Sequence, residues 1–153
     1  MLLAKRNEKI VRKDGAVEYD RSGYKYIVAM HAAFFISFLS EYFFLDKTLN
    51  SHCRILTVIF ILSQALRYWS IASLGKYWNT KVLVVPGTPV IKSGPYNYFR
   101  HPNYLVVLIE IAVTPLIFSC YLTSALFTIL NLILLRRRIE IEESVLSNFP
   151  IRE

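Results

Sequence analysis

The sequence predicts an all-α fold, a polytopic membrane helical bundle with about four transmembrane helices. Three observations support this class. Hydrophobic residues make up 54 % of the 153 residues and aromatic residues 14 %, which is high for a soluble domain. Long apolar stretches contain almost no charge, and lysine and arginine gather beside them. The length corresponds to one domain covering residues 1–153.

The distribution of charge along the sequence indicates whether the partners are nucleic acids or membrane lipids. A formal net charge of +7 is compatible with nucleic acid, but nucleic-acid-binding proteins carry their basic stripe on a soluble fold. Here the basic clusters flank apolar runs, so we expect membrane lipids as partners and no nucleic acid. The two cysteines, Cys53 and Cys120, form no CxxC motif and have no histidine nearby at metal-ligand spacing. We therefore expect buried thiols and no metal site.

The predicted spans follow from the apolar segments. The first covers residues 26–45 and the second residues 55–74. A third apolar region, residues 104–135, is too long for one crossing, because about 20 residues suffice. We expect two antiparallel spans there, joined by a tight turn within residues 119–123. Pro115 should bend the first of these two spans or end it early.

Lysine and arginine are unequally divided between the two sides of the predicted membrane. The loop between the first two spans contains only Lys47 and Arg54, whereas the remaining segments outside the spans contain fifteen such residues. The positive-inside rule then places both termini and the 75–102 loop in the cytoplasm. The N-terminal segment MLLAKRNEK reads as the end of an apolar helix followed by its basic flank.

Residues 75–102 form a connection too long for a simple link between helices. Two β-branched runs, residues 82–85 and 90–91, surround the sequence PGTP and predict a small hairpin or an extended flap. The loop ends with His101 and Pro102. Since proline suits the first turn of a helix, the third span should start at Pro102.

Two polar clusters flank the predicted helical hairpin. One is the turn at His101, and the other is the segment RRRIEIEESVL, where Arg138 and Glu142 are four residues apart and share a helix face. An antiparallel hairpin returns to the surface from which it left, so both clusters should converge on a ligand pocket. The alternatives are a helix-flanking histidine in an interfacial aromatic belt, and a basic flank followed by surface ion pairs.

The motif GPYNYFRHPNY, the helical hairpin and the pattern RxxxEExxL at Arg138, Glu142, Glu143 and Leu146 resemble the isoprenylcysteine carboxyl methyltransferase family. Its members are integral-membrane enzymes that use S-adenosyl-L-methionine. The segments AKRNEK, GAVEY and LGKYWNTKVLVVPGTPVIKSGPYNYFRHPNYLVV are more similar still to a small bacterial branch associated with O-methylation of alkylpyrones. The resemblance covers most of the chain. Membrane sterol reductases share RHPNY, so the later Arg/Glu-Glu element favours methyl transfer.

This resemblance implies a cytoplasmic cofactor pocket. It places Arg138 where the family has the catalytic arginine that meets the anionic oxygen of the substrate. The residues it implies for binding S-adenosyl-L-methionine are Thr88, Pro89, Val90, Ile91, Tyr96, His101, Pro102, Asn103, Tyr104 and Glu142. Methyl transfer from a sulfonium is an in-line displacement that needs alignment and no covalent nucleophile. The chain has no GxGxxG motif, which argues against the soluble Rossmann-type methyltransferase fold.

The chain departs from the family pattern at both ends. Compared with relatives, we expect it to lack a helix before Lys5, and its sequence reaches SNFPIRE without the longer aromatic tail that usually follows the Glu-Glu element. Within the spans, Arg67 and Glu110 lie at similar depths, about 10 and 12 Å from the cytoplasmic end. An ion pair, a substrate-tunnel lining and snorkelling of Arg67 are the open interpretations. We expect His31 to be packed inside and Glu41 to lie near the outer end.

The sequence therefore predicts a membrane enzyme that methylates an oxygen of a lipophilic carboxylate or enol. An alkylpyrone-like acceptor comes first and a prenylcysteine-like acceptor second. An NADPH-dependent sterol-type reductase would explain RHPNY but gives no role to Arg138 and Glu142. A phospholipid N-methyltransferase, with a neutral amine acceptor, would tolerate charge reversal at Arg138. A small membrane scaffold would bind neither cofactor. The oligomeric state stays open.

Overall fold

The structure of the protein is a computed structural model, and it describes residues 2–88 and 91–147. Within these residues, the chain is mostly helical, as predicted, with two short strands and two 3-10 turns. In chain order the elements are α1 (Leu2–Lys13), β1 (Val17–Tyr19), α2 (Arg21–Phe44), α3 (Cys53–Leu74), η1 (Gly75–Tyr77), β2 (Val82–Val84), η2 (Gly94–Asn97), α4 (Pro102–Ile117) and α5 (Tyr121–Ser147).

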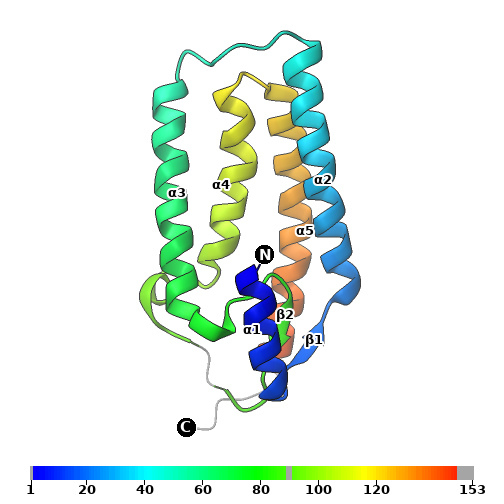
Figure 1. Ribbon diagram of the computed structural model, residues 1–153, viewed down its shortest axis with the longest axis vertical. Helices are drawn as coiled ribbons and strands as arrows, with labels where there is room; N and C mark the ends of the chain where they lie inside the picture. Colours follow the sequence, from blue (N-terminus) through cyan, green and yellow to red (C-terminus); the bar gives the residue numbers. More distant parts are fainter. Residues whose placement is uncertain (1, 89–90, 148–153) are drawn as a thin grey trace.

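The four long helices, α2 to α5, stand side by side, and α1 and the strands lie at one end of them (Figure 1). α3 packs against α4, α4 against α5, and α5 against α2. The first long helix therefore pairs with the last one rather than with its neighbour in the sequence. The start of α1 and the end of α5 lie at the same end of the bundle (Figure 1).

α4 and α5 form the predicted helical hairpin. α4 begins at Pro102, as predicted, and ends two residues after Pro115. The turn at residues 118–120 follows, in which Ser119 has a φ of 56°. The N–H of Cys120 closes this turn by donating to the carbonyl of Pro115 at 2.9 Å. A proline near the helix end therefore stops α4 early, which is one of the two outcomes that the sequence predicts.

Among the described residues, two helices are long and apolar enough to cross a membrane, Arg21–Phe44 and Cys53–Tyr77. Only 17 % and 11 % of their apolar windows are buried within the protein, so neither is the core helix of a soluble fold. Their exposed side chains include Phe35, Ile36 and Leu62, which suit a lipid environment. α4 is apolar but has 16 residues, and charge begins in α5 at Arg136. The count of four crossings stays a prediction.

Aromatic packing joins α2 to the hairpin. Met30 and Phe34 of α2 are buried against Ile111 of α4 and Phe127 of α5. The rings of Phe34 and Phe127 meet edge to face, with centroids 5.6 Å apart and planes at 74°. This contact gives α2 its place in the bundle.

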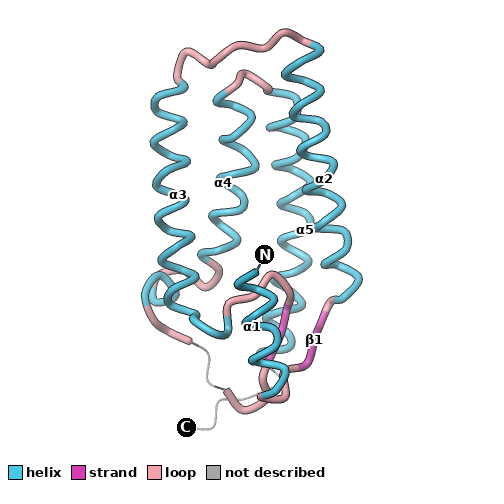
Figure 2. Tube along the Cα trace, viewed as in Figure 1, coloured by secondary structure: helices cyan, strands magenta, loops and turns pink. Residues whose placement is uncertain are grey.

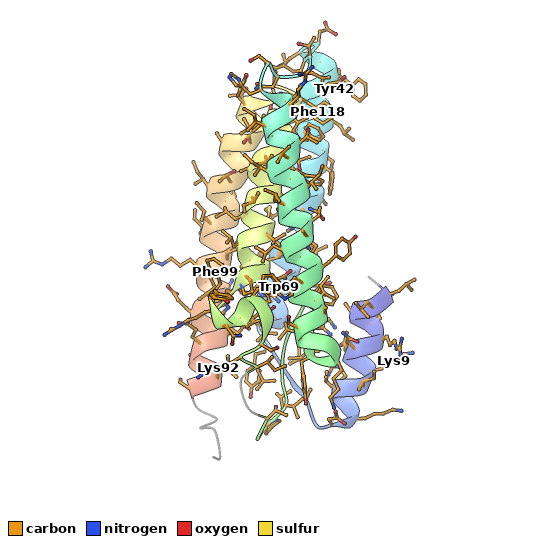
Figure 3. The ribbon with its side chains drawn as sticks, turned by 90° about the vertical axis from the view of Figure 1, so that its left-hand side faces the viewer. Lys9, Tyr42, Trp69, Lys92, Phe99 and Phe118 are labelled. Carbon is orange, nitrogen blue, oxygen red and sulfur yellow. The ribbon has the colours of Figure 1, made fainter. Side chains whose placement is uncertain are left out.

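Glu41 fixes the far end of the same interface. Its carboxylate accepts hydrogen bonds from the N–H groups of Leu122 and Thr123 at 3.2 and 2.7 Å. It therefore caps the first turn of α5 from another helix, where a negative charge is favourable. The rings of Tyr42 and Phe118 lie close by, with centroids 5.7 Å apart, at the top of the bundle in Figure 3.

α1 corrects the interpretation of the N-terminal segment. The helix continues through the basic residues instead of ending before them, and it buries Ala4, Asn7 and Val11 on one face. The Asn7 side-chain amide donates to the carbonyls of Gly75 and Trp78, at 3.0 and 2.8 Å. α1 thus packs on the loop that follows α3 and is not merely the flank of a span.

The strand pairing also differs from the prediction. β2 pairs antiparallel with β1, with Val17 opposite Val84 and Tyr19 opposite Val82 (Figure 2). The partner strand of β2 comes from the N-terminal segment and not from Ile91, so the predicted hairpin is wrong for the described residues. The alternative, an extended flap, stays a prediction. Ile91 belongs to no strand, and Val90 lies outside the described residues.

Candidate cofactor cleft

The loop before α4 is fixed closely against α3. Gly94 has a φ of +55°, and a Cβ placed on it would lie 2.1 Å from Ser73 Oγ and 2.8 Å from Trp69 Nε1. A side chain is excluded there by both the backbone conformation and the space. Figure 3 shows Trp69 and Phe99 at this end of the bundle. The close approach places Tyr96 and the start of α4 beside the end of α3.

The start of α4 and the end of α5 meet through a chain of hydrogen bonds. Arg138 Nε donates to the Tyr104 hydroxyl at 2.9 Å, and this hydroxyl donates to Glu142 Oε2 at 2.5 Å. Arg138 Nη2 also donates to the carbonyl of Thr80 at 2.6 Å. Arg138 is only 6 % exposed, so these bonds hold its guanidinium in a buried position. The predicted convergence of the two polar clusters is confirmed.

His101 and Glu143 lie next to this chain of hydrogen bonds. The ring of His101 stacks on that of Tyr104, with centroids 5.3 Å apart and planes at 14°. His101 Nε2 is 3.3 Å from Glu143 Oε1, and Arg100 Nη1 is 3.6 Å from the same oxygen. The two adjacent glutamates therefore have different partners, Tyr104 for Glu142 and the His101 turn for Glu143.

A cavity of about 210 Å³ lies at this junction. The predicted site residues in its wall are Thr88, Ile91, Tyr96, His101, Asn103, Tyr104, Arg138 and Glu142. Pro102 is buried at the start of α4 without lining the cavity. Pro89 and Val90 lie outside the described residues. We call this cavity the cleft; the role of its residues in binding stays a prediction.

Tyr96 contributes a protonated hydroxyl to the cleft. Burial raises its pKa to about 12, and the nearby negative charge of Glu142 adds to this rise. The phenol therefore stays neutral at physiological pH. It can act as a hydrogen-bond donor beside the charged side chains of Arg138 and Glu142, which also line the cleft.

One wall of the cleft consists of residues that no sequence motif indicated. Tyr77, Trp78, Asn79 and Lys81 line it from the segment after α3. Only the composition of the segment KYWNTK, with its aromatic and amide side chains, could have indicated a role in binding, because the segment contains no recognisable motif. The hydrogen bonds that hold these residues in place come from α1, which is far away in the sequence.

Two polar atoms in the cleft residues are buried without a partner among the described residues. They are the indole Nε1 of Trp78 and the side-chain Oδ1 of Asn103. Leaving such groups unpaired costs free energy. Both therefore suit a polar ligand that provides the missing partner.

An apolar hollow of about 410 Å³ adjoins the cleft between α4 and α5. We call it the groove. It shares His101 and Tyr104 with the cleft. The other residues that line it are Leu105, Leu108, Leu132, Leu135, Arg136, Ile139 and Glu140.

Of the three open interpretations of Arg67 and Glu110, the structure shows the ion pair. Both nitrogens of the Arg67 fork bind the Glu110 carboxylate, with Nε at 2.9 Å from Oε1 and Nη2 bonded to Oε2. Gln64 Nε2 donates to the same Oε1 at 2.6 Å. His31 is half-buried rather than fully packed, with Nδ1 2.8 Å from the carbonyl of Ile27. Within residues 2–88 and 91–147, no group of three or more potential metal ligands comes together.

A model of the isoprenylcysteine carboxyl methyltransferase (ICMT) family matches residues 55–148. The match covers more than half of the sequence and includes α3, the loop before α4, and the helical hairpin. The chain belongs to the ICMT family. Membership makes it a membrane methyltransferase, and it confirms the family resemblance drawn from the GPYNYFRHPNY and RxxxEExxL motifs.

Two relatives extend this similarity across the whole chain. YpbQ of Bacillus subtilis (strain 168) is 42 % identical over 152 residues, which cover 99 % of this chain and 90 % of the relative. A protein of Haemophilus influenzae is 29 % identical over 147 residues, with 95 % and 86 % covered. Neither name states an activity. No solved structure matches this ICMT-family chain.

Proposed function

We propose that this ICMT-family protein transfers a methyl group from S-adenosyl-L-methionine to an oxygen of a lipophilic carboxylate or enol. In this proposal all four long helices cross the membrane, and the cleft and both termini face the cytoplasm. The observation that carries it is the chain of Arg138, Tyr104 and Glu142 where the polar cleft meets the apolar groove.

The cleft residues fit the cofactor. Glu142 uses one carboxylate oxygen for Tyr104, and its other oxygen suits an ammonium or hydroxyl group of the ligand. Trp78 Nε1 and Asn103 Oδ1 need one acceptor and one donor, respectively. The rings of Trp78, Tyr96 and Tyr104 provide surface for a purine. When bound, the cofactor supplies an electrophilic methyl group on a positively charged sulfur.

Arg138 would hold the acceptor. A carboxylate or an enolate is already an anion, so the enzyme needs no base to activate it. A guanidinium binds such oxygens with a fork of donors. Because Tyr104 and the Thr80 carbonyl hold Nε and Nη2, the orientation of Arg138 is set before the acceptor arrives. Such prior alignment is the main contribution that an enzyme makes to a displacement reaction.

The groove supports a lipophilic acceptor. Its leucine and isoleucine side chains would cover an alkyl or prenyl tail, and burial of apolar surface contributes roughly 25 cal/mol per Å². Since groove and cleft share His101 and Tyr104, one molecule can occupy both, with its head beside Arg138. We place an alkylpyrone-like acceptor before a prenylcysteine-like one on the basis of the sequence resemblance.

Calorimetric titration of the detergent-purified protein tests the cofactor. We expect saturable binding of S-adenosylhomocysteine and none of NADPH. Glu142→Gln should weaken binding about tenfold or more, because a hydrogen bond to a charged group contributes about 1.5–3 kcal/mol. Glu140→Gln is the matched control, and it should bind as the wild type does because Glu140 pairs with Arg136 and does not line the cleft. NADPH binding instead would favour a reductase, and binding of neither would favour a scaffold.

Transfer of a labelled methyl group tests the role of Arg138. Arg138→Glu should abolish transfer to a lipophilic acid while leaving the affinity for S-adenosylhomocysteine within a few-fold of the wild type. Retained transfer to an amine-bearing phospholipid in this variant would contradict the proposal and indicate a neutral acceptor.

A further inference from the structure

α1 has two faces with different chemistry. One face buries Ala4, Asn7 and Val11 against the rest of the protein. The other carries the exposed cations Lys5, Arg6, Lys9 and Lys13. Among the described residues, none of these four cations forms an ion pair, whereas Arg12 pairs with Glu8 at 2.7 Å and also with Glu18. The basic face therefore has positive charge without a partner in the described part of the chain.

The position of α1 brings this face to the predicted membrane surface. α1 stands alongside the end of α3, with its N-terminal end directed toward the long helices (Figures 1 and 3). Leu2, at that end, is 86 % exposed, and Lys9 points away from the bundle in Figure 3. An apolar end directed toward the bilayer, followed by cations on the outward face, is the arrangement that suits an anionic lipid surface.

The opposite face of α1 holds the wall of the cleft that comes from the segment after α3. Asn7 binds the carbonyls of Gly75 and Trp78, at 3.0 and 2.8 Å. Lys81 Nζ donates to Glu8 Oε1 at 2.8 Å, and Asn79 Nδ2 donates to the carbonyl of Ala4 at 3.1 Å. Three cleft residues, Trp78, Asn79 and Lys81, are thus attached to α1 directly.

We propose that the basic face of α1 binds anionic phospholipid headgroups and that this contact orders the cleft wall which α1 holds. The inference rests on the proposed function in one respect, because it takes from it that the cleft and α1 face the cytoplasmic side of the membrane. A lipid contact that holds α1 in place also holds residues 77–81, because the same short helix carries both faces. Linkage then requires that anionic lipid and a ligand of the cleft strengthen each other's binding.

Hydrogen–deuterium exchange of the amides in residues 77–85 tests the lipid effect without any cofactor. The protein is placed in nanodiscs of phosphatidylcholine, and in nanodiscs of an equal mixture with phosphatidylglycerol. We expect slower exchange in the mixture for the wild type, and no such difference for Arg6→Gln/Lys9→Gln. The matched control is Lys47→Gln/Arg54→Gln, which also removes one lysine and one arginine, at the opposite end of the bundle. It should keep the wild-type difference.

Equal exchange of the wild type in the two lipids would overturn the inference, and so would an unchanged difference in Arg6→Gln/Lys9→Gln. High salt gives a test that needs no substitution, because screening should reduce the wild-type difference. S-adenosylhomocysteine should bind about fivefold more tightly in the mixture. If it binds in neither lipid while the exchange difference persists, the proposed function fails and the lipid contact stands. If S-adenosylhomocysteine binds with the same affinity in both lipids and the exchange rates are also the same in both, the lipid inference alone fails.

Discussion

Replacing Glu110 by alanine should destabilise the protein strongly, because it leaves a charged Arg67 without its partner at membrane depth. Arg67 lies seven residues from the end of α3 at Leu74, or about 10 Å along the helix. Its side chain is 24 % exposed, so most of it is covered by the rest of the protein. Gln64 loses the acceptor of its 2.6 Å hydrogen bond in the same step.

The magnitude follows from these two losses. An arginine near the centre of a membrane helix costs about 2.5–3.5 kcal/mol. Arg67 falls near the lower end of this range, since it lies toward one end of α3. The lost hydrogen bond of Gln64 to a carboxylate adds about 1.5 kcal/mol. We therefore expect Glu110→Ala to lower the free energy of unfolding by about 4 kcal/mol.

The double variant Arg67→Leu/Glu110→Leu is the informative comparison. It removes both charges, and apolar replacement of a buried ion pair is often close to neutral. Only the loss of the Gln64 hydrogen bond, about 1.5 kcal/mol, should therefore remain. Unfolding in mixed micelles with a rising fraction of dodecyl sulfate, followed by circular dichroism, measures both variants. A double variant as unstable as Glu110→Ala would refute the reasoning, as would a single variant with wild-type stability.

Three further predictions concern other parts of the fold. Gly94→Ala should lower the free energy of unfolding by about 1–3 kcal/mol and weaken cofactor binding, because the added Cβ clashes with α3. The control is Gly87→Ala, which is also at positive φ but has open space around it, and it should leave binding unchanged. Glu41→Ala should cost about 1–3 kcal/mol in the same unfolding assay, because two N–H groups of α5 lose their acceptor. The hydrogen bond to Lys81 lowers the pKa of Glu8 below its ordinary value of 4.5. The stabilisation by Glu8 is therefore present above pH 4.5 and is lost as the pH falls through the lowered pKa. The difference in unfolding midpoint between wild type and Glu8→Gln should shrink over this range, and a difference that grows in acid would contradict the assignment.

The helical hairpin and the convergence of the cleft were predictable because their signals are local. Pro102 marks the start of α4, and Pro115 lies two residues before its end. The apolar run that ends before Arg136 is long enough for two helices, so the second helix must run back antiparallel to the first. Once the hairpin is assumed, Tyr104 and Arg138 must lie at the same end, so the site follows from topology rather than from distances.

The support of the cleft could not be predicted in this way. Asn7 finds its two carbonyl acceptors 68 and 71 residues away, and nothing in its own neighbourhood indicates them. β1 has only three residues, too few for a periodic pattern, and its partner β2 lies across the whole of α2 and α3. Long-range pairing of short segments depends on the packed structure, so the two β-branched runs of the loop suggested a local hairpin instead.

The pairing of α2 with α5 has a consequence for how the chain is assembled during its synthesis. α2 leaves the ribosome before α3, α4 and α5, but the helix it packs against is α5. Until α5 arrives, Phe34 lacks the ring of Phe127 and the Glu41 carboxylate lacks the amides that it caps. The same helix brings Arg138 and Glu142 to the cleft. Completion of the bundle and completion of the cleft are therefore one event, so a nascent chain cannot present a working pocket on an unfinished bundle.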